Sequence, residues 1–413
     1  MSNRLRYQRM MASATSGFTL VALLPSLAML GGLALIARGS SVAQWSALGV
    51  GGSFGGFASL IALFGWRFVG PTYVARSDAD RRRSIYAQSL ADRMMLLLLL
   101  CIPLIVATAL TVAPSGRVIG IAMALATSLN GVTAVWFAVG TGSPWYVFGS
   151  ETVPKMIGTL IGGGAVWMGL PAVVLPVGVA SGSVVACWLV SRHVLDSEWG
   201  RVTKALGSIR TSLRPQVQAA IAEMAAGGYT VASVAIVGGF ASPAVTALFA
   251  SGDRLFRASL VPLSAMANAL QNRASTSQDR ASAVLLAVCA PMLLVGVGGS
   301  IFITLFGPMV SRSLFGQQFA VPAPAAAAYG VAFLAVAMNS TLGRHILAPR
   351  QRFDVVLTAT LAGAVVGGPA IAIGAAEGGV TGAVFGLALG ELVVATAMGA
   401  QIMSGWPRSR RSG

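Results

Sequence analysis

The segment from Ala250 to Ala258 places Asp253, Arg254 and Arg257 inside an otherwise apolar stretch. On a helix, side chains three or four residues apart lie on the same face, so all three groups can share one face. Ionisable groups at bilayer depth are costly and face a cavity or a partner. Two interpretations stay open. Asp253 and Arg257 can form a self-neutralising pair within the helix, or the segment can present a cationic spot to a cavity. One arginine would then remain for an anionic group, since the guanidinium fork suits phosphate.

Two glutamates, Glu223 and Glu391, lie well inside other apolar stretches. A carboxyl group in an apolar environment favours its neutral form and can bind and release a proton. Together with Asp253 these residues are candidates for coupling to H⁺ or Na⁺. The alternative for each is a neutral carboxyl group hydrogen-bonded to a neighbouring helix. No other cofactor and no metal site is expected, because the histidines are few and distant and the three cysteines have no CxxC spacing.

The elements that carry these residues are helices that cross a membrane. The chain has 413 residues, of which 55% are hydrophobic and only 10% charged. About a dozen apolar stretches have roughly the 20 residues that a helix needs to cross a bilayer. They lack the alternation of barrel strands. We therefore predict an all-α polytopic membrane protein with twelve spans, at 15–37, 43–66, 88–113, 117–140, 152–169, 172–192, 216–239, 243–271, 281–306, 323–346, 354–375 and 379–403.

The basic residues set the orientation. The formal net charge is +16, and nearly all the arginines lie in every second loop, as the positive-inside rule requires of cytoplasmic loops. An even number of spans then places both termini in the cytoplasm. Basic loops beside apolar stretches indicate contact with anionic lipid, and this placement argues against nucleic acid as a partner.

A polar, basic connection near the middle of the chain divides it into two halves. We predict an N-lobe at 1–193 with helices one to six, a basic cytoplasmic linker at 194–215, a C-lobe at 216–403 with helices seven to twelve, and a basic tail at 404–413. Two lobes of equal helix count and common orientation match a known transporter layout, with a cavity between them.

Several function classes are disfavoured. The sequence has no P-loop, and no catalytic cluster lies in a soluble segment. An enzyme acting on membrane-bound glycans, such as a polymerase or ligase, would need a large outer loop, and the predicted outer loops are short. We therefore expect no enzyme.

Several segments carry a resemblance to a known family, and they are Leu35–Ser53 with Gly65–Pro71, Trp136–Gly140, Ala247–Phe256, Phe306–Pro308 with Ser313–Gly316, and Gly378–Ala383. They resemble the Wzx-type polysaccharide flippases of the multidrug/oligosaccharidyl-lipid/polysaccharide (MOP) exporter superfamily. The resemblance covers most of the chain.

The resemblance implies a flippase that moves undecaprenyl-diphosphate-linked oligosaccharide across the bacterial cytoplasmic membrane for polysaccharide or lipopolysaccharide synthesis. Arg254 and Arg257 would line the substrate cavity, with Arg67 and Arg344 nearer its cytoplasmic mouth. Glu223, Asp253 and Glu391 would couple ions. A polysaccharide polymerase and glycosyltransferases are the implied partners. The alternative is a cation-coupled exporter of small molecules, of the multidrug and toxin extrusion (MATE) type.

Overall fold

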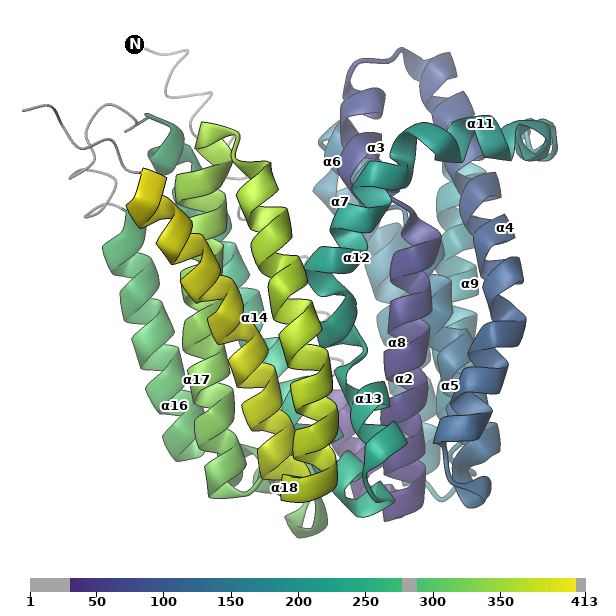
Figure 1. Cartoon of the computed structure of the whole chain (residues 1–413). Helices are drawn as coiled ribbons and strands as arrows, with labels where there is room; N and C mark the ends of the chain where they lie inside the picture. Colours follow the sequence, from purple (N-terminus) through teal and green to yellow (C-terminus); the bar gives the residue numbers. More distant parts are fainter. Residues whose placement is uncertain (1–29, 277–287, 406–413) are drawn as a thin grey trace, which may run out of the picture. The chain divides into compact units, whose positions relative to one another are not determined.

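The computed structural model describes residues 30–276 and 288–405, and all regular elements within these ranges are helices. Seven of them are long and apolar enough to cross a membrane. The predicted class, an all-α polytopic membrane protein, is confirmed (Figure 1). Parts of three predicted segments lie outside the described residues, namely 15–29 of the first span, 281–287 of the ninth span and 406–413 of the tail.

Each predicted span has a helical counterpart within the described ranges. The longer helices are Leu30–Gly39, α2 (Val42–Leu63), α3 (Trp66–Ala75), α4 (Ala79–Thr111), α5 (Arg117–Ser128), α8 (Val153–Trp167), α9 (Val174–Leu195), α12 (Val217–Val231), α13 (Ser233–Phe240), α14 (Pro243–Thr276), α16 (Ala290–Phe315), α17 (Ala323–Ser340) and α18 (Phe353–Gly405). Shorter helical elements connect them, namely η1 (Pro114–Gly116), η2 (Leu129–Val132), α6 (Val135–Thr141), α7 (Pro144–Val147), η3 (Phe148–Thr152), α10 (Gly200–Ala205), η4 (Leu206–Ser208), α11 (Ile209–Leu213), η5 (Arg214–Gln216), η7 (Gln317–Phe319), η8 (Thr341–Leu347) and η9 (Ala348–Arg350).

Contacts divide the chain into two units. The first comprises Met1–Ala258 with Ser311–Ala320, and the second comprises Ser259–Val310 with Val321–Gly413. The predicted division at the basic linker remains a prediction.

Close helix packing through glycine shapes the first unit. A Cβ atom on Gly51 of α2 would lie 2.1 Å from the carbonyl oxygen of Gly120 on α5, and one on Gly55 would lie 2.3 Å from that of Ala124. In lipid, the hydrophobic effect does not drive helices together. Small residues let the helix backbones come close, and this close packing holds the helices together. The high glycine content thus has a packing role.

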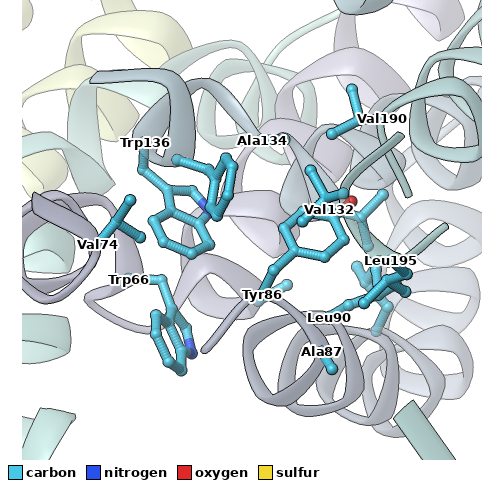
Figure 2. Packing of buried hydrophobic residues seen from close by; sticks show 14 residues of the cluster. Trp66, Val74, Tyr86, Ala87, Leu90, Val132, Ala134, Trp136, Val190 and Leu195 are labelled. Atoms are coloured by element: carbon cyan, nitrogen blue, oxygen red, sulfur yellow. The ribbon is translucent and has the colours of Figure 1, made fainter. Parts of the chain in front are cut away.

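An aromatic cluster fills the core around α3, α4 and α6 of the first unit (Figure 2). The rings of Trp66 and Trp136 are 5.4 Å apart, and Tyr86 meets Phe137 edge-on at the same distance. In contrast, α4 exposes large apolar side chains such as Ile102, which is 74% exposed, as a lipid-facing helix would. Val132 of η2 belongs to this core, so the core supports the helix break at η2. The same break borders a cavity that is described below.

Glycine also shapes the second unit. The helix α18 contains the predicted spans 354–375 and 379–403 as two arms that meet at Gly379, whose φ of +60° is left-handed. A Cβ atom on Gly374 would lie 2.2 Å from the carbonyl oxygen of Gly382, so the arms pack against each other beside the turn. Only glycine takes such a backbone conformation at no steric cost.

The basic linker is helical rather than extended, and it is attached to α4. Arg201 of α10 pairs with Asp80 at 2.6 Å, and the Ser212 hydroxyl of α11 donates to Asp92 at 2.6 Å. Hydrogen bonds to Asp80 and Glu198 raise the pKa of the Arg201 guanidinium above its ordinary value. In Figure 1, α11 runs across the direction of α4.

Candidate functional site

A cavity of about 540 Å³ lies within the first unit. Helices α2, α5, α8, α9 and α14 contribute to its wall, together with the helix breaks at η2 and η3. Its ionisable lining residues are Glu151, Lys155, Asp253, Arg254 and Arg257. Hydroxyl and amide side chains also line it, from Ser53, Thr127, Asn130, Thr133, Thr152, Thr159 and Ser183. The predicted residues of α14 therefore do border a cavity.

Arg254 is held by an aromatic ring rather than by a carboxylate. Its guanidinium carbon lies 3.8 Å from the centre of the Trp45 ring, within cation–π range. Trp45 is fully buried, stacks on Phe319 at 5.5 Å and donates its indole N–H to the Ser251 hydroxyl at 2.9 Å. The Nη1 atom of Arg254 is buried and makes no hydrogen bond with any described residue. The ring thus fixes the cation without using that donor.

Asp253 and Arg257 form the predicted ion pair within the helix. The Nε atom of Arg257 lies 2.6 Å from a carboxylate oxygen of Asp253, and Asp253 is 5% exposed. Arg257 also donates to the backbone carbonyl of Thr230, just before the break between α12 and α13. The structure therefore contains the ion pair within the helix, and Arg254 contacts an aromatic ring instead. The predicted role of these arginines in binding an anionic group stays a prediction.

The break between α12 and α13 is also joined to α2. The Ser53 hydroxyl donates to the carbonyl of Val231 at 2.7 Å and accepts from the amide of Ala235 at 3.1 Å. A break in a membrane helix leaves backbone groups that another helix must satisfy. Ser53 and Arg257 satisfy such groups at the wall of the cavity.

A second charged pair, Glu151 and Lys155, lies on the cavity wall and was not among the predicted site residues. Lys155 Nζ is 2.7 Å from Glu151 Oε1, and Glu151 is 4% exposed. The Thr133 hydroxyl and the backbone amide of Ala134 also donate to this carboxylate. The four-residue spacing is that of Asp253 and Arg257, so the same signal could have identified the pair.

Arg67 and Glu223 belong to the first unit but do not line the cavity. Arg67 is an exposed residue at the start of α3. Glu223 on α12 is 4% exposed, and neither of its carboxylate oxygens has a hydrogen-bond partner among the described residues. Arg67 is a cation that acts on it electrostatically. Their predicted roles at the cavity mouth and in ion coupling remain predictions.

Arg344 and Glu391 belong to the second unit. Arg344 is exposed on η8, a π-helical turn. Glu391 on α18 is 8% exposed, and the Asn339 amide donates to its carboxylate at 2.8 Å. This hydrogen bond from a neighbouring helix is of the kind expected under the alternative to ion coupling. The role of Glu391 in coupling stays a prediction.

Two further buried charges, Asp92 and Arg93, occupy α4. Arg93 is fully buried and donates to the backbone carbonyls of Ser89, Gly131 and Thr133, beside the break at η2. It lies well inside α4, which begins at Ala79. Arg93 therefore supports a helix break at the cavity wall.

No family model and no curated protein matches the chain. Solved structures do resemble it. An inward-facing multidrug resistance MATE family transporter of the MOP superfamily has a TM-score of 0.66 and 15% identity, over 94% of each chain. The lipid II flippase MurJ in an inward closed conformation has a TM-score of 0.69 and 12% identity, over 94% of this chain and 87% of that one.

The MATE multidrug transporter DinF-BH in complex with R6G has a TM-score of 0.64 and 14% identity, over 96% of this chain and 95% of that one. Nearly the whole chain is covered in each comparison. The helices and the cavity therefore belong to a chain that shares the fold of these solved structures.

Proposed function

We propose that this protein is a membrane transporter that flips an undecaprenyl-diphosphate-linked oligosaccharide across the cytoplasmic membrane by alternating access. The observation that carries the proposal is Arg254, a cation in the cavity wall whose guanidinium lies on the Trp45 ring and makes no hydrogen bond or ion pair among the described residues. Where the guanidinium borders the cavity, a phosphate oxygen would accept a charge-assisted hydrogen bond from it.

The charge of the cavity favours an anionic substrate over a cationic one. Both of its carboxylates already have a cation, because Asp253 pairs with Arg257 and Glu151 pairs with Lys155. The third cation, Arg254, has no carboxylate among the hydrogen bonds and ion pairs of the described residues. An organic cation would meet no unpaired acidic group on this wall, whereas an anion would meet an unpaired donor.

The size and lining of the cavity suit a headgroup. At about 540 Å³ it lies within the range of pockets that hold small organic molecules. Its hydroxyl and amide side chains, such as Asn130 and Ser183, can bind sugar hydroxyls. A polyprenyl chain would exceed this volume and would remain in the bilayer. MurJ, whose fold the chain shares, is itself a lipid flippase.

A second candidate is a cation-coupled exporter of small molecules. The observation in its favour is the similarity to MATE multidrug transporters over nearly the whole chain. In either case Glu223, Asp253 and Glu391 are the proposed sites of H⁺ or Na⁺ coupling. A polysaccharide polymerase and glycosyltransferases are the proposed partners of the flippase alone.

A leaflet-resolved assay of lipid-linked glycan in a deletion strain separates the two candidates. Under the proposed function, deletion traps the glycolipid in the inner leaflet. Wild-type protein restores flipping, whereas Arg254→Gln lowers it about tenfold or more, the loss expected for one charged contact. Arg210→Gln on the exposed linker is the matched control and should restore flipping fully. Normal flipping in the deletion strain, together with sensitivity to drugs, would instead support the exporter.

A further inference from the structure

A shallow groove of about 690 Å³ lies in the first unit, between the segment that begins at α7 and the C-terminal end of α9. Trp145 and Tyr146 line one side of it, and Arg192, His193 and Asp196 line the other. The rings of Tyr146 and His193 lie 4.5 Å apart and join the two sides. The described residues of this groove and those of the larger cavity do not overlap, so the groove is a separate feature.

The groove holds two opposite charges that do not pair with each other. Arg192 and Asp196 lie four positions apart, a spacing at which opposite charges on a helix commonly pair. The guanidinium carbon of Arg192 instead lies 5.3 Å from the centre of the Trp188 ring. The side chain of Asp196 forms no hydrogen bond or ion pair with any residue that the structure describes. Both side chains are exposed, so a ligand can reach a cation and an anion in one groove.

The two charges follow an exposed apolar stripe along α9. Val177, Val184 and Trp188 are all exposed, and their spacings of seven and four residues put them on one face of this membrane-spanning helix. The contact with Trp188 directs the guanidinium of Arg192 back toward this stripe, whereas Asp196 directly follows the last residue of α9. Tryptophan is typical of the membrane–water interface. The order along the helix is therefore apolar surface, then cation, then anion.

We propose that this groove binds the headgroup of phosphatidylethanolamine, with Arg192 on the phosphate and Asp196 on the terminal ammonium. The lipid presents acyl chains, phosphate and ammonium in the same order in which α9 presents apolar surface, cation and anion. A phosphatidylglycerol headgroup has no cation for Asp196, and the trimethylated ammonium of phosphatidylcholine has no N–H group to donate to it. The predicted orientation places the groove at the cytoplasmic leaflet. The inference does not depend on which substrate the protein transports.

The backbone of Asp196 provides a variant that separates binding from folding. Asp196 has a φ of +53°, in the left-handed region that favours glycine, so a side chain at this position is unfavourable for the backbone. Strain of this kind persists at functional sites. Asp196→Gly relieves it and removes the carboxylate. We expect this variant to unfold at the same temperature as wild type or higher and to lose its lipid preference, whereas a merely structural role of Asp196 would lower that temperature.

Native mass spectrometry of the full chain in detergent tests the lipid preference. The probes are phosphatidylethanolamine, phosphatidylcholine and phosphatidylglycerol with the same acyl chains. Wild-type protein should bind phosphatidylethanolamine most tightly. Asp196→Asn and Asp196→Gly should weaken that binding about threefold, to the level of phosphatidylcholine, as the loss of an exposed ionic contact predicts. Arg192→Gln should weaken the binding of all three lipids, because each carries a phosphate. Glu377→Gln, at an exposed glutamate of α18, is the control and should bind like wild type.

Each outcome decides for or against the proposed lipid site. A preference for phosphatidylethanolamine that both Asp196 variants lose and Glu377→Gln keeps, with no loss of thermal stability in Asp196→Gly, supports the site. Equal binding of phosphatidylethanolamine and phosphatidylcholine by wild type overturns it, as does a preference that survives in Asp196→Gly. Tightest binding of phosphatidylglycerol would mean that the groove attracts anionic lipid through Arg192 alone, and the role of Asp196 would then be wrong.

Discussion

At the scale of single residues, Arg254 and Arg257 lie one helical turn apart and are held in different ways. Arg257 is held by the Asp253 carboxylate and the Thr230 carbonyl, whereas Arg254 lies on the Trp45 ring. The charge of Arg257 is already balanced by a carboxylate, so Arg257 needs no ligand. Arg254 has no such partner, and a buried N–H donor without an acceptor is unfavourable. The neighbours of each arginine, rather than its position along the helix, therefore decide which one is the better ligand contact.

The Glu151 carboxylate joins three elements, so its removal should destabilise the protein. In Glu151→Ala, Lys155 and the Ala134 amide both lose their partner, and breaking a buried pair in this way costs about 3–5 kcal/mol. We expect a clearly lower midpoint of thermal unfolding in detergent. Glu377→Ala, at an exposed glutamate of α18, is the control and should unfold like wild type. Equal midpoints for the two variants would mean that Glu151 does not hold the break at η2.

At the scale of elements, the α2–α5 contact should tolerate no added side-chain volume. A Cβ atom on Gly51 would lie 2.1 Å from the Gly120 carbonyl oxygen, so Gly51→Ala must push the two helices apart. Overpacking of this kind costs about 1–3 kcal/mol. The control is Gly164→Ala on α8, where nothing lies within 4 Å of the added carbon. In a denaturant series, Gly51→Ala should unfold at a lower denaturant concentration than Gly164→Ala. Equal unfolding midpoints would contradict the close packing of α2 and α5.

The attachment of the linker should depend on Asp92. This carboxylate accepts hydrogen bonds from Ser212 at 2.6 Å, Gln88 at 2.8 Å and Trp66 at 3.3 Å. In Asp92→Ala all three donors lose their acceptor, and the linker loses its bond through Ser212. We expect trypsin to cleave the linker at Lys204 faster in this variant. Arg83→Gln, which removes only a half-exposed ion pair with Glu198, should change the rate little. Similar rates in both variants would show that Asp92 does not hold the linker.

The positions of the helices follow from the sequence more directly than the site does. Apolar length predicted the spans because it is a local property, and the predicted spans 152–169 and 172–192 are indeed separated at Gly169, a left-handed residue between α8 and α9. Spacing on one helix likewise predicted the Asp253–Arg257 pair. Trp45 and Arg254 meet across 209 positions, so no local pattern could indicate that contact. The contacts of Arg93 with Gly131 and Thr133 likewise span 38 and 40 positions, so spacing on α4 could not indicate them.

At the scale of the whole molecule, the predicted orientation places the linker in the cytoplasm and the α4–α5 connection outside. Single cysteines at Thr203 and Ser115, both exposed, test this in a protein without its three native cysteines. We expect a membrane-impermeant thiol reagent to label Ser115→Cys in intact cells and Thr203→Cys only after the membrane is opened. The positive-inside distribution requires this result. Labelling of Thr203→Cys in intact cells would overturn the predicted topology.

The ring beneath Arg254 also makes the cavity optically observable. Trp45 is a fluorophore in contact with a cation, and a phosphate that draws the guanidinium away would change the electric field at the indole. In a variant whose other seven tryptophans are replaced, of the eight present, occupancy of the cavity should shift the emission spectrum. The same side chain that positions the arginine would then report each filling and emptying of the cavity in real time.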